Sequence, residues 1–141
     1  METKDVSSLW PDFDFGAIKT PIAILQEQAN ELGKKAKHVI LGEIITTEAY
    51  EEKTGEMALI YQFYVKAPVL SNYRFLLFRL VQRSSLYPVD IYFEPGKQKI
   101  ENVQENEFTE KLRNILNNEK TKEIVQNLYA QSVQIKGSHG E

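Results

Sequence analysis

Aromatic rings and arginine side chains that could bind a ligand together are concentrated between residues 61 and 93. This stretch, YQFYVKAPVLSNYRFLLFRLVQRSSLYPVDIYF, holds most of the chain's aromatic residues and all but one of its arginines. Rings can stack on the bases of single-stranded nucleic acid, and guanidinium groups can hold carboxylates or phosphates through two hydrogen bonds. The stretch is therefore the first candidate for a binding surface.

Many of these side chains are predicted to share one face of a sheet, because successive residues of a strand point to opposite faces. The candidate partner-binding face consists of Tyr64, Tyr73, Phe75, Leu77, Arg79, Arg83 and Tyr92. Leaving so much apolar surface wet would forfeit several kcal/mol at about 25 cal/mol per Å2. We expect a helix, the N-terminal segment, a second copy of the chain or a ligand to cover this face.

Three hypotheses account for the arginines of this face. A protein partner, or a second copy of the chain, could present an acidic segment to Arg79 and Arg83. Single-stranded nucleic acid could stack on the rings, although a net charge of -3 and a sequence pI near 5.5 do not favour phosphate binding. In the simplest alternative, both arginines pair across strands with Asp90 or Glu94 and serve only the sheet.

Few residues could perform catalysis or hold a metal ion. The chain has no cysteine and only two histidines, His38 and His139, which leaves no basis for a thiolate nucleophile or a histidine-rich zinc site. Asp90 and Glu94, with Lys97 beyond a turn, could form the acidic-lysine site of a metal-dependent hydrolase. The spacing between Glu94 and Lys97, however, is one residue longer than that motif requires. We expect no catalytic residue, metal or cofactor, and the hydrolase is the least favoured alternative.

The elements that would position these residues are predicted from two patterns of apolar residues, helical spacing and strand alternation. Thr20 and Pro21 are typical of a helix start, and Gly33 of a helix end. Alternating patterns rich in β-branched and aromatic residues predict strands at 38–47, 56–66, 72–83 and 89–94, with a short fifth strand at 97–103. Helical spacing returns on either side of Asn117-Asn118, around Phe108 to Leu116 and Ile124 to Tyr129.

These elements predict an α+β fold with an N-terminal helix, an antiparallel meander of four to five strands and two C-terminal helices. Short connections favour antiparallel pairing, because parallel strands need long crossovers. A Greek-key-like strand order, built from the same elements, stays open.

The 141 residues are enough for one domain, predicted at 20–134, with an arm at 1–19 and a flexible tail at 135–141. We expect Trp10, Phe13 and Phe15 of the arm to pack against the body, since exposed rings are costly. The absence of cysteine, of signal-peptide blocks and of a long apolar run predicts a soluble, cytoplasmic protein that does not enter membranes. The overall prediction is a non-catalytic module that binds a protein partner or another copy of itself.

Overall fold

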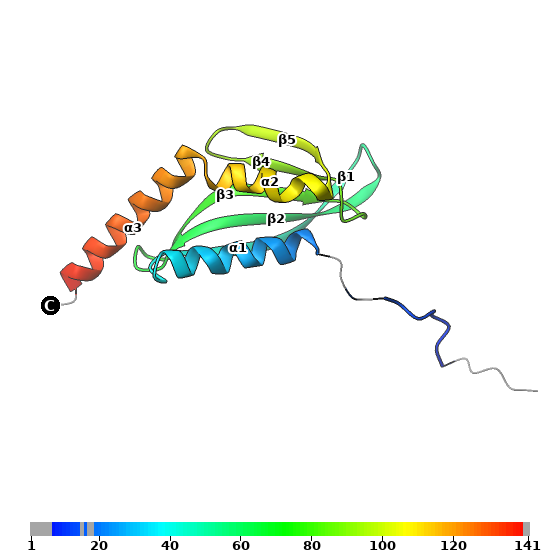
Figure 1. Cartoon of the computed structure of the whole chain (residues 1–141), viewed down its shortest axis with the longest axis horizontal. Helices are drawn as coiled ribbons and strands as arrows, with labels where there is room; N and C mark the ends of the chain where they lie inside the picture. Colours follow the sequence, from blue (N-terminus) through cyan, green and yellow to red (C-terminus); the bar gives the residue numbers. More distant parts are fainter. Residues whose placement is uncertain (1–6, 15, 17–18, 140–141) are drawn as a thin grey trace, which may run out of the picture.

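The structure, a computed structural model, describes residues 7–14, 16 and 19–139, without the side chains of 137–139. It confirms the α+β fold (Figure 1). The elements are α1 (Pro21–Lys35), β1 (Leu41–Glu51), β2 (Glu56–Ala67), β3 (Tyr73–Gln82), β4 (Val89–Phe93), β5 (Gln98–Val103), α2 (Glu105–Leu116) and α3 (Glu119–His139). The helix α3 thus continues into residues 135–139, which were predicted to belong to a flexible tail. The domain limits themselves stay a prediction.

The start of α1 is as predicted, but its end is not. The Thr20 hydroxyl accepts a hydrogen bond from the backbone N–H of Ala23 at 3.3 Å, and proline occupies the first turn. Gly33 is buried inside the helix and does not terminate it. The chain instead turns into β1 through two residues with left-handed backbone angles, Lys37 (φ 54°) and His38 (φ 61°). The prediction that Gly33 ends the helix is therefore wrong. The left-handed backbone positions that follow the helix, where glycine is usual, are occupied by Lys37 and His38.

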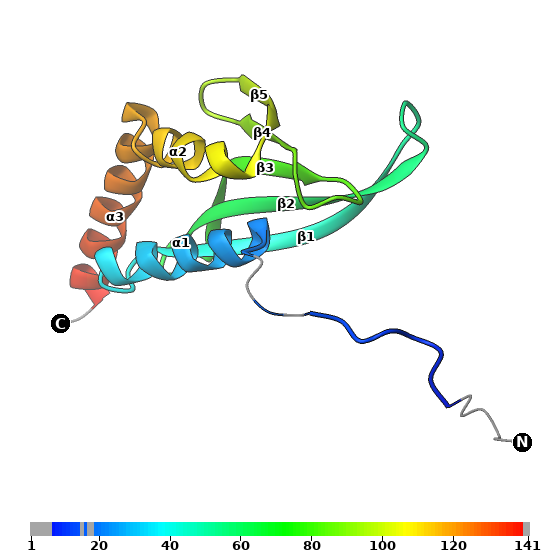
Figure 2. The same cartoon turned by 45° about the vertical axis from the view of Figure 1, so that its right-hand side comes forward.

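The five strands form one sheet in the order β1-β2-β3-β4-β5, and every neighbouring pair is antiparallel. The meander is thus confirmed, and the Greek-key-like order is excluded for the described residues. The hairpin of β1 and β2 is long and twisted, and its tip extends beyond the helices (Figure 2).

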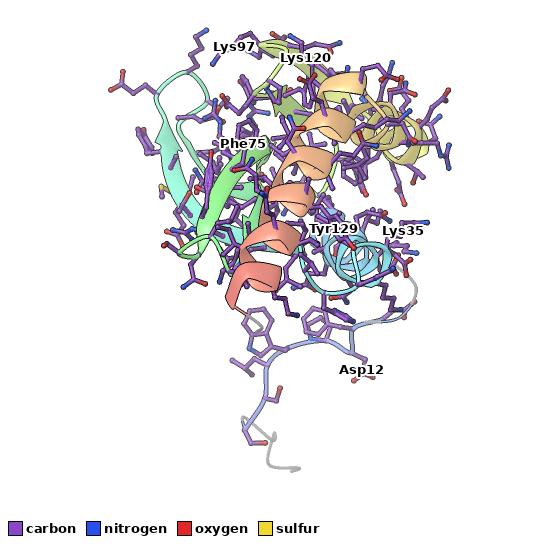
Figure 3. All side chains as sticks on the ribbon, turned by 90° about the vertical axis from the view of Figure 1, so that its left-hand side faces the viewer. Asp12, Lys35, Phe75, Lys97, Lys120 and Tyr129 are labelled. Atoms are coloured by element: carbon purple, nitrogen blue, oxygen red, sulfur yellow. The ribbon has the colours of Figure 1, made fainter. Side chains whose placement is uncertain are left out.

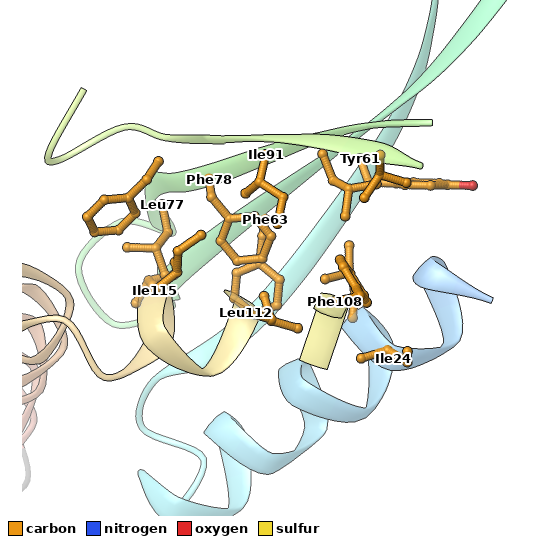
Figure 4. Packing of buried hydrophobic residues seen from close by; sticks show 14 of the residues in the cluster. Ile24, Tyr61, Phe63, Leu77, Phe78, Ile91, Phe108, Leu112 and Ile115 are labelled. Atoms are coloured by element: carbon orange, nitrogen blue, oxygen red, sulfur yellow. The ribbon is translucent and has the colours of Figure 1, made fainter. Parts of the chain in front are cut away.

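One face of the sheet, the core face, is covered by α1 and α2 (Figure 4). Its centre is the pair Phe63 and Phe78, whose rings stack with centroids 5.0 Å apart. The helix α1 approaches β1 so closely that a Cβ atom on Gly42 would lie 2.6 Å from the Cα of Ala29. Glycine at this position therefore sets how tightly the helix packs on the strand.

The helix α3 crosses the end of the domain (Figures 1 and 2), and its buried side chains form one stripe. The buried residues of this stripe are Thr121, Leu128 and Ser132. They lie seven and four residues apart, the spacing of residues on one side of a helix. Beyond Ser132, Val133 and Ile135 are exposed. The last turns of α3 therefore project from the domain.

The arm does not pack against the body. Its described part, residues 7–14, extends away from the sheet (Figure 2), and Leu9, Trp10 and Phe13 are 85%, 77% and 53% exposed. The structure thus corrects the expectation that Trp10 and Phe13 pack on the body, because both side chains stay largely exposed. Phe15 lies outside the described residues.

Candidate binding surfaces

A β-bulge in β3 divides the predicted partner-binding face. Phe63 pairs with Phe78, whereas the next residue of β2, Tyr64, pairs with Leu76, so Leu77 is the extra residue. An extra residue reverses the alternation of side chains on one side of it. The prediction that Tyr73, Phe75 and Leu77 share a face with Tyr64, Arg79, Arg83 and Tyr92 is therefore wrong.

The three displaced residues lie on the core face. Leu77 is 1% exposed, and Phe75 packs against the core cluster. Tyr73 stands opposite the buried Ala67 at the end of the sheet and is itself exposed. Leu76, which pairs with Tyr64, lies on the opposite side of the sheet.

The opposite side of the sheet, here the outer face, carries aromatic rings covered by cationic side chains. The guanidinium carbon of Arg74 lies 5.2 Å from the centroid of the Tyr64 ring. Arg79 lies 5.0 Å from the centroid of the Tyr92 ring, and the Lys99 ammonium lies 5.2 Å from it. No helix of the described chain lies over this face (Figures 1 and 2). Arginine and lysine stems therefore supply much of the cover that the apolar rings require.

These cations are in turn neutralised by carboxylates. Arg79 Nε donates to Glu94 at 3.0 Å, Arg74 donates to Glu43 at 2.9 Å, and Lys99 lies 3.0 Å from Glu101. The hydrogen bond from Arg74 holds the pKa of Glu43 below its ordinary value of 4.5, although partial burial opposes this shift. The cross-strand pairing expected for Arg79 is confirmed. A surface whose positive charges are already paired has little to offer a phosphate backbone.

Arg83 joins three strands at one end of the sheet. Its Nε and Nη2 donate to the two carboxylate oxygens of Glu51 at 2.6 and 3.0 Å, and Nη2 also donates to Asp90 at 3.0 Å. The other oxygen of Asp90 accepts from the backbone N–H of Asn102 at 2.9 Å. The hydrogen bonds from Arg83 hold the pKa of Glu51 below its ordinary value and raise that of Arg83. These contacts explain Arg83 as a structural residue.

The acidic pair considered for a hydrolase is occupied by the same network. Asp90 is buried and bound by Arg83 and Asn102, and Glu94 is bound by Arg79 with Lys97 3.8 Å away. Within residues 7–14, 16 and 19–139, no three histidine, cysteine or acidic side chains are placed to hold a metal ion together. The described residues therefore give the hydrolase hypothesis no support.

A concavity lies on the core face of the sheet, between side chains of α1, α2 and α3. It is a pocket of about 620 Å3. At its base lie Phe63, Val65 and Leu77, which are almost fully buried. Half-buried apolar side chains of the helices form its walls: Leu32 from α1, Leu116 from α2, and Val125 and Tyr129 from α3.

Polar side chains surround the opening of this pocket. They are Gln28, Glu31 and Lys35 from α1, and Asn117, Lys122 and Gln126 from the α2–α3 segment. Figure 3, which looks onto α3, shows Tyr129 directed toward the end of α1 that carries Lys35. An apolar interior with a few polar groups at the mouth is the usual composition of a ligand site, and the volume lies within the usual range.

Sequence analysis did not find this pocket. The apolar spacing around Ile124 to Tyr129 indicated a helix, and the same stripe supplies the wall residues Val125 and Tyr129. The hollow itself arises from the angle at which α3 leaves α2 after Asn117, which is a tertiary property. Of the predicted face, only Leu77 reaches the pocket, where it forms part of the base.

Comparison of the chain with protein-family models, curated proteins and solved structures gave no match. In the described part of the chain, no helix combines the length and the apolar character needed to cross a membrane. The function must therefore be argued from the two surfaces alone.

Proposed function

We propose that the domain is a non-catalytic binding module that recognises a protein partner through an aromatic side chain inserted between α1 and α3. The observation that carries this proposal is the pocket of about 620 Å3, whose walls leave Leu32, Val125 and Tyr129 only half buried. Large aromatic anchors buried in apolar pockets dominate the affinity of many protein interfaces. The volume of the pocket is ample for one such aromatic side chain together with an apolar neighbour.

The opening of the pocket favours an acidic residue next to the aromatic anchor. Lys35 and Lys122 lie at the mouth, one on each helix, with Glu31 as the opposing charge. Lys122 is 50% exposed and forms a 3.4 Å ion pair with Glu119, which is itself 89% exposed. An exposed pair of this kind contributes little, so Lys122 can exchange its partner for a carboxylate of a bound peptide. We place this activity in the cytoplasm, for which the cysteine-free chain is suited.

The outer face is a weaker candidate. Tyr64, Arg79, Arg83 and Tyr92 remain predicted partner contacts, but each arginine already has a carboxylate partner within the domain. A partner would have to replace those pairs to gain affinity. No observation on this face favours single-stranded nucleic acid over a protein.

The test is a selection of random peptides displayed on phage against the immobilised full-length protein, followed by affinity measurements on the enriched peptides. We expect enrichment of tryptophan or phenylalanine beside aspartate or glutamate. Val125→Glu should reduce affinity at least about tenfold, because it places a charge against the apolar anchor. Val133→Glu is the matched control, since it makes the same change on the same helix at an exposed position outside the pocket.

Circular dichroism must show that both variants melt as cooperatively as the wild type. If Val125→Glu fails to fold, Lys122→Glu at the exposed mouth serves in its place, with a loss of affinity for acidic peptides expected. No enrichment, or enriched peptides that bind both valine variants equally, would contradict the proposal. Peptides displaced only by changes at Tyr64 or Arg79 would transfer the function to the outer face.

A further inference from the structure

We propose that the N-terminal arm, residues 7–14, is an internal ligand that inserts Trp10 into the pocket of its own chain. The inference rests on the proposed function, because it assigns an occupant to the same pocket. Its consequence is regulatory: a partner would have to displace the arm. In the structure the arm extends away from the sheet (Figure 2). None of its described residues lines the pocket.

The chemistry of the arm matches that of the pocket. Leu9 and Trp10 are among the most exposed large apolar side chains of the described chain, and the Phe13 ring is tilted at 47° to that of Trp10 with ring centroids 6.1 Å apart. Asp12 and Asp14 follow within the same segment. An apolar anchor with adjacent carboxylates is the combination that an apolar pocket with lysines at its mouth would select.

The chain is long enough to make this contact within one molecule. Lys19 is held beside α1, because its carbonyl accepts from the Tyr87 hydroxyl at 3.3 Å and its ammonium lies 3.4 Å from Glu27. From there to Trp10 an extended chain spans roughly 30 Å at about 3.3 Å per residue. The whole of α1, with 15 residues, is about 22 Å long. The arm can therefore reverse direction and reach the half of α1 that lines the pocket.

The linkage favours the arm of the same chain over that of a second copy. A segment joined by a short linker acts at an effective concentration on the order of 1 mM. If the arm binds with a Kd of about 0.1 mM, the closed form outnumbers the open form by about ten to one. At micromolar protein concentration, the same Kd would leave the exchange of arms between molecules almost unpopulated.

Trp10 reports this equilibrium directly, because it is the only tryptophan of the chain. We would measure its emission and its quenching by acrylamide in the wild type, Val125→Glu and Val133→Glu. The wild type and Val133→Glu should show blue-shifted emission and a quenching constant several-fold lower than that of Val125→Glu, independent of protein concentration. Lys35→Glu/Lys122→Glu, which changes only side chains at the mouth, should also release Trp10.

Water-like emission of Trp10 that is the same in every variant would overturn the inference. Shielding that increases with protein concentration, together with a dimer in sedimentation, would also overturn it and assign the pocket to a second copy. The proposed function is separable from both outcomes, because selected peptides could still bind at the pocket while Trp10 stays exposed. If the arm does close the pocket, Trp10→Ala should raise the affinity for a selected peptide about tenfold.

Discussion

Replacing Arg83 by leucine should destabilise the domain more than replacing any more exposed arginine of the sheet. In the wild type, Arg83 bridges Glu51, which is 28% exposed, and Asp90, which is 9% exposed. Glu51 can return to water when Arg83 is removed, so this pair contributes at most about 1 kcal/mol. Asp90 stays buried and keeps only the backbone N–H of Asn102, a loss of about 1.5 to 3 kcal/mol. We therefore expect a total loss of about 1.5 to 4 kcal/mol.

The assay is urea unfolding at neutral pH, followed by circular dichroism, with Arg74→Leu as the matched control. Arg74 also holds a carboxylate, but it is 45% exposed and should cost no more than about 1 kcal/mol. The two variants should unfold with similar m-values, so that the difference in midpoint reflects stability. Equal costs for the two substitutions would refute the assignment of Arg83 as a structural bridge.

The same cluster predicts a dependence on pH. Because Glu51 has a lower pKa in the folded state, its contribution to stability is complete well above the ordinary value of 4.5 and is lost as the pH falls through the folded-state pKa. The stability difference between wild type and Arg83→Leu should therefore shrink below pH 4.5. A difference that stays constant down to strongly acidic pH would contradict the ion-pair explanation.

Two further predictions concern the packing of α1 and the charge of the outer face. Gly42→Ala should destabilise by about 1 to 3 kcal/mol, because the new Cβ would meet the backbone of Ala29, whereas Gly33→Ala inside α1 meets only ordinary contacts and should stabilise by up to about 1 kcal/mol. Equal effects of both substitutions in thermal unfolding would contradict the packing described here. Labelled single-stranded DNA should show no salt-sensitive binding by fluorescence anisotropy, since the outer-face cations are paired; binding that is lost in Arg79→Ala/Arg83→Ala would show that these pairs open to a ligand.

Local sequence signals predicted the order of the elements because each signal acts within a few residues. Thr20 and Pro21 start α1 through a side-chain cap and a fixed backbone angle, and both effects are local. The alternating pattern likewise predicted a strand at 56–66, and in β2 the alternate residues Tyr61, Phe63 and Val65 are buried. Short connections then left antiparallel pairing as the natural arrangement.

The candidate site was less predictable because it depends on contacts between distant segments. The bulge at Leu77 follows from the pairing of β2 with β3, and no residue in the sequence marks it. Arg74 and Arg79 cover the rings of Tyr64 and Tyr92 within the domain. The alternation of residues along a strand does not reveal this role of the arginines. The pocket depends on where α3 departs from the body.

The most direct test of the proposed function is to map the amide resonances of the labelled protein as a selected peptide is added. The account predicts that the largest shifts surround the pocket, at Leu32, Lys122, Val125 and Tyr129, and that Val125→Glu abolishes them while Val133→Glu does not. Shifts centred instead on Tyr64, Arg79 and Tyr92 would contradict it and make the outer face the binding surface.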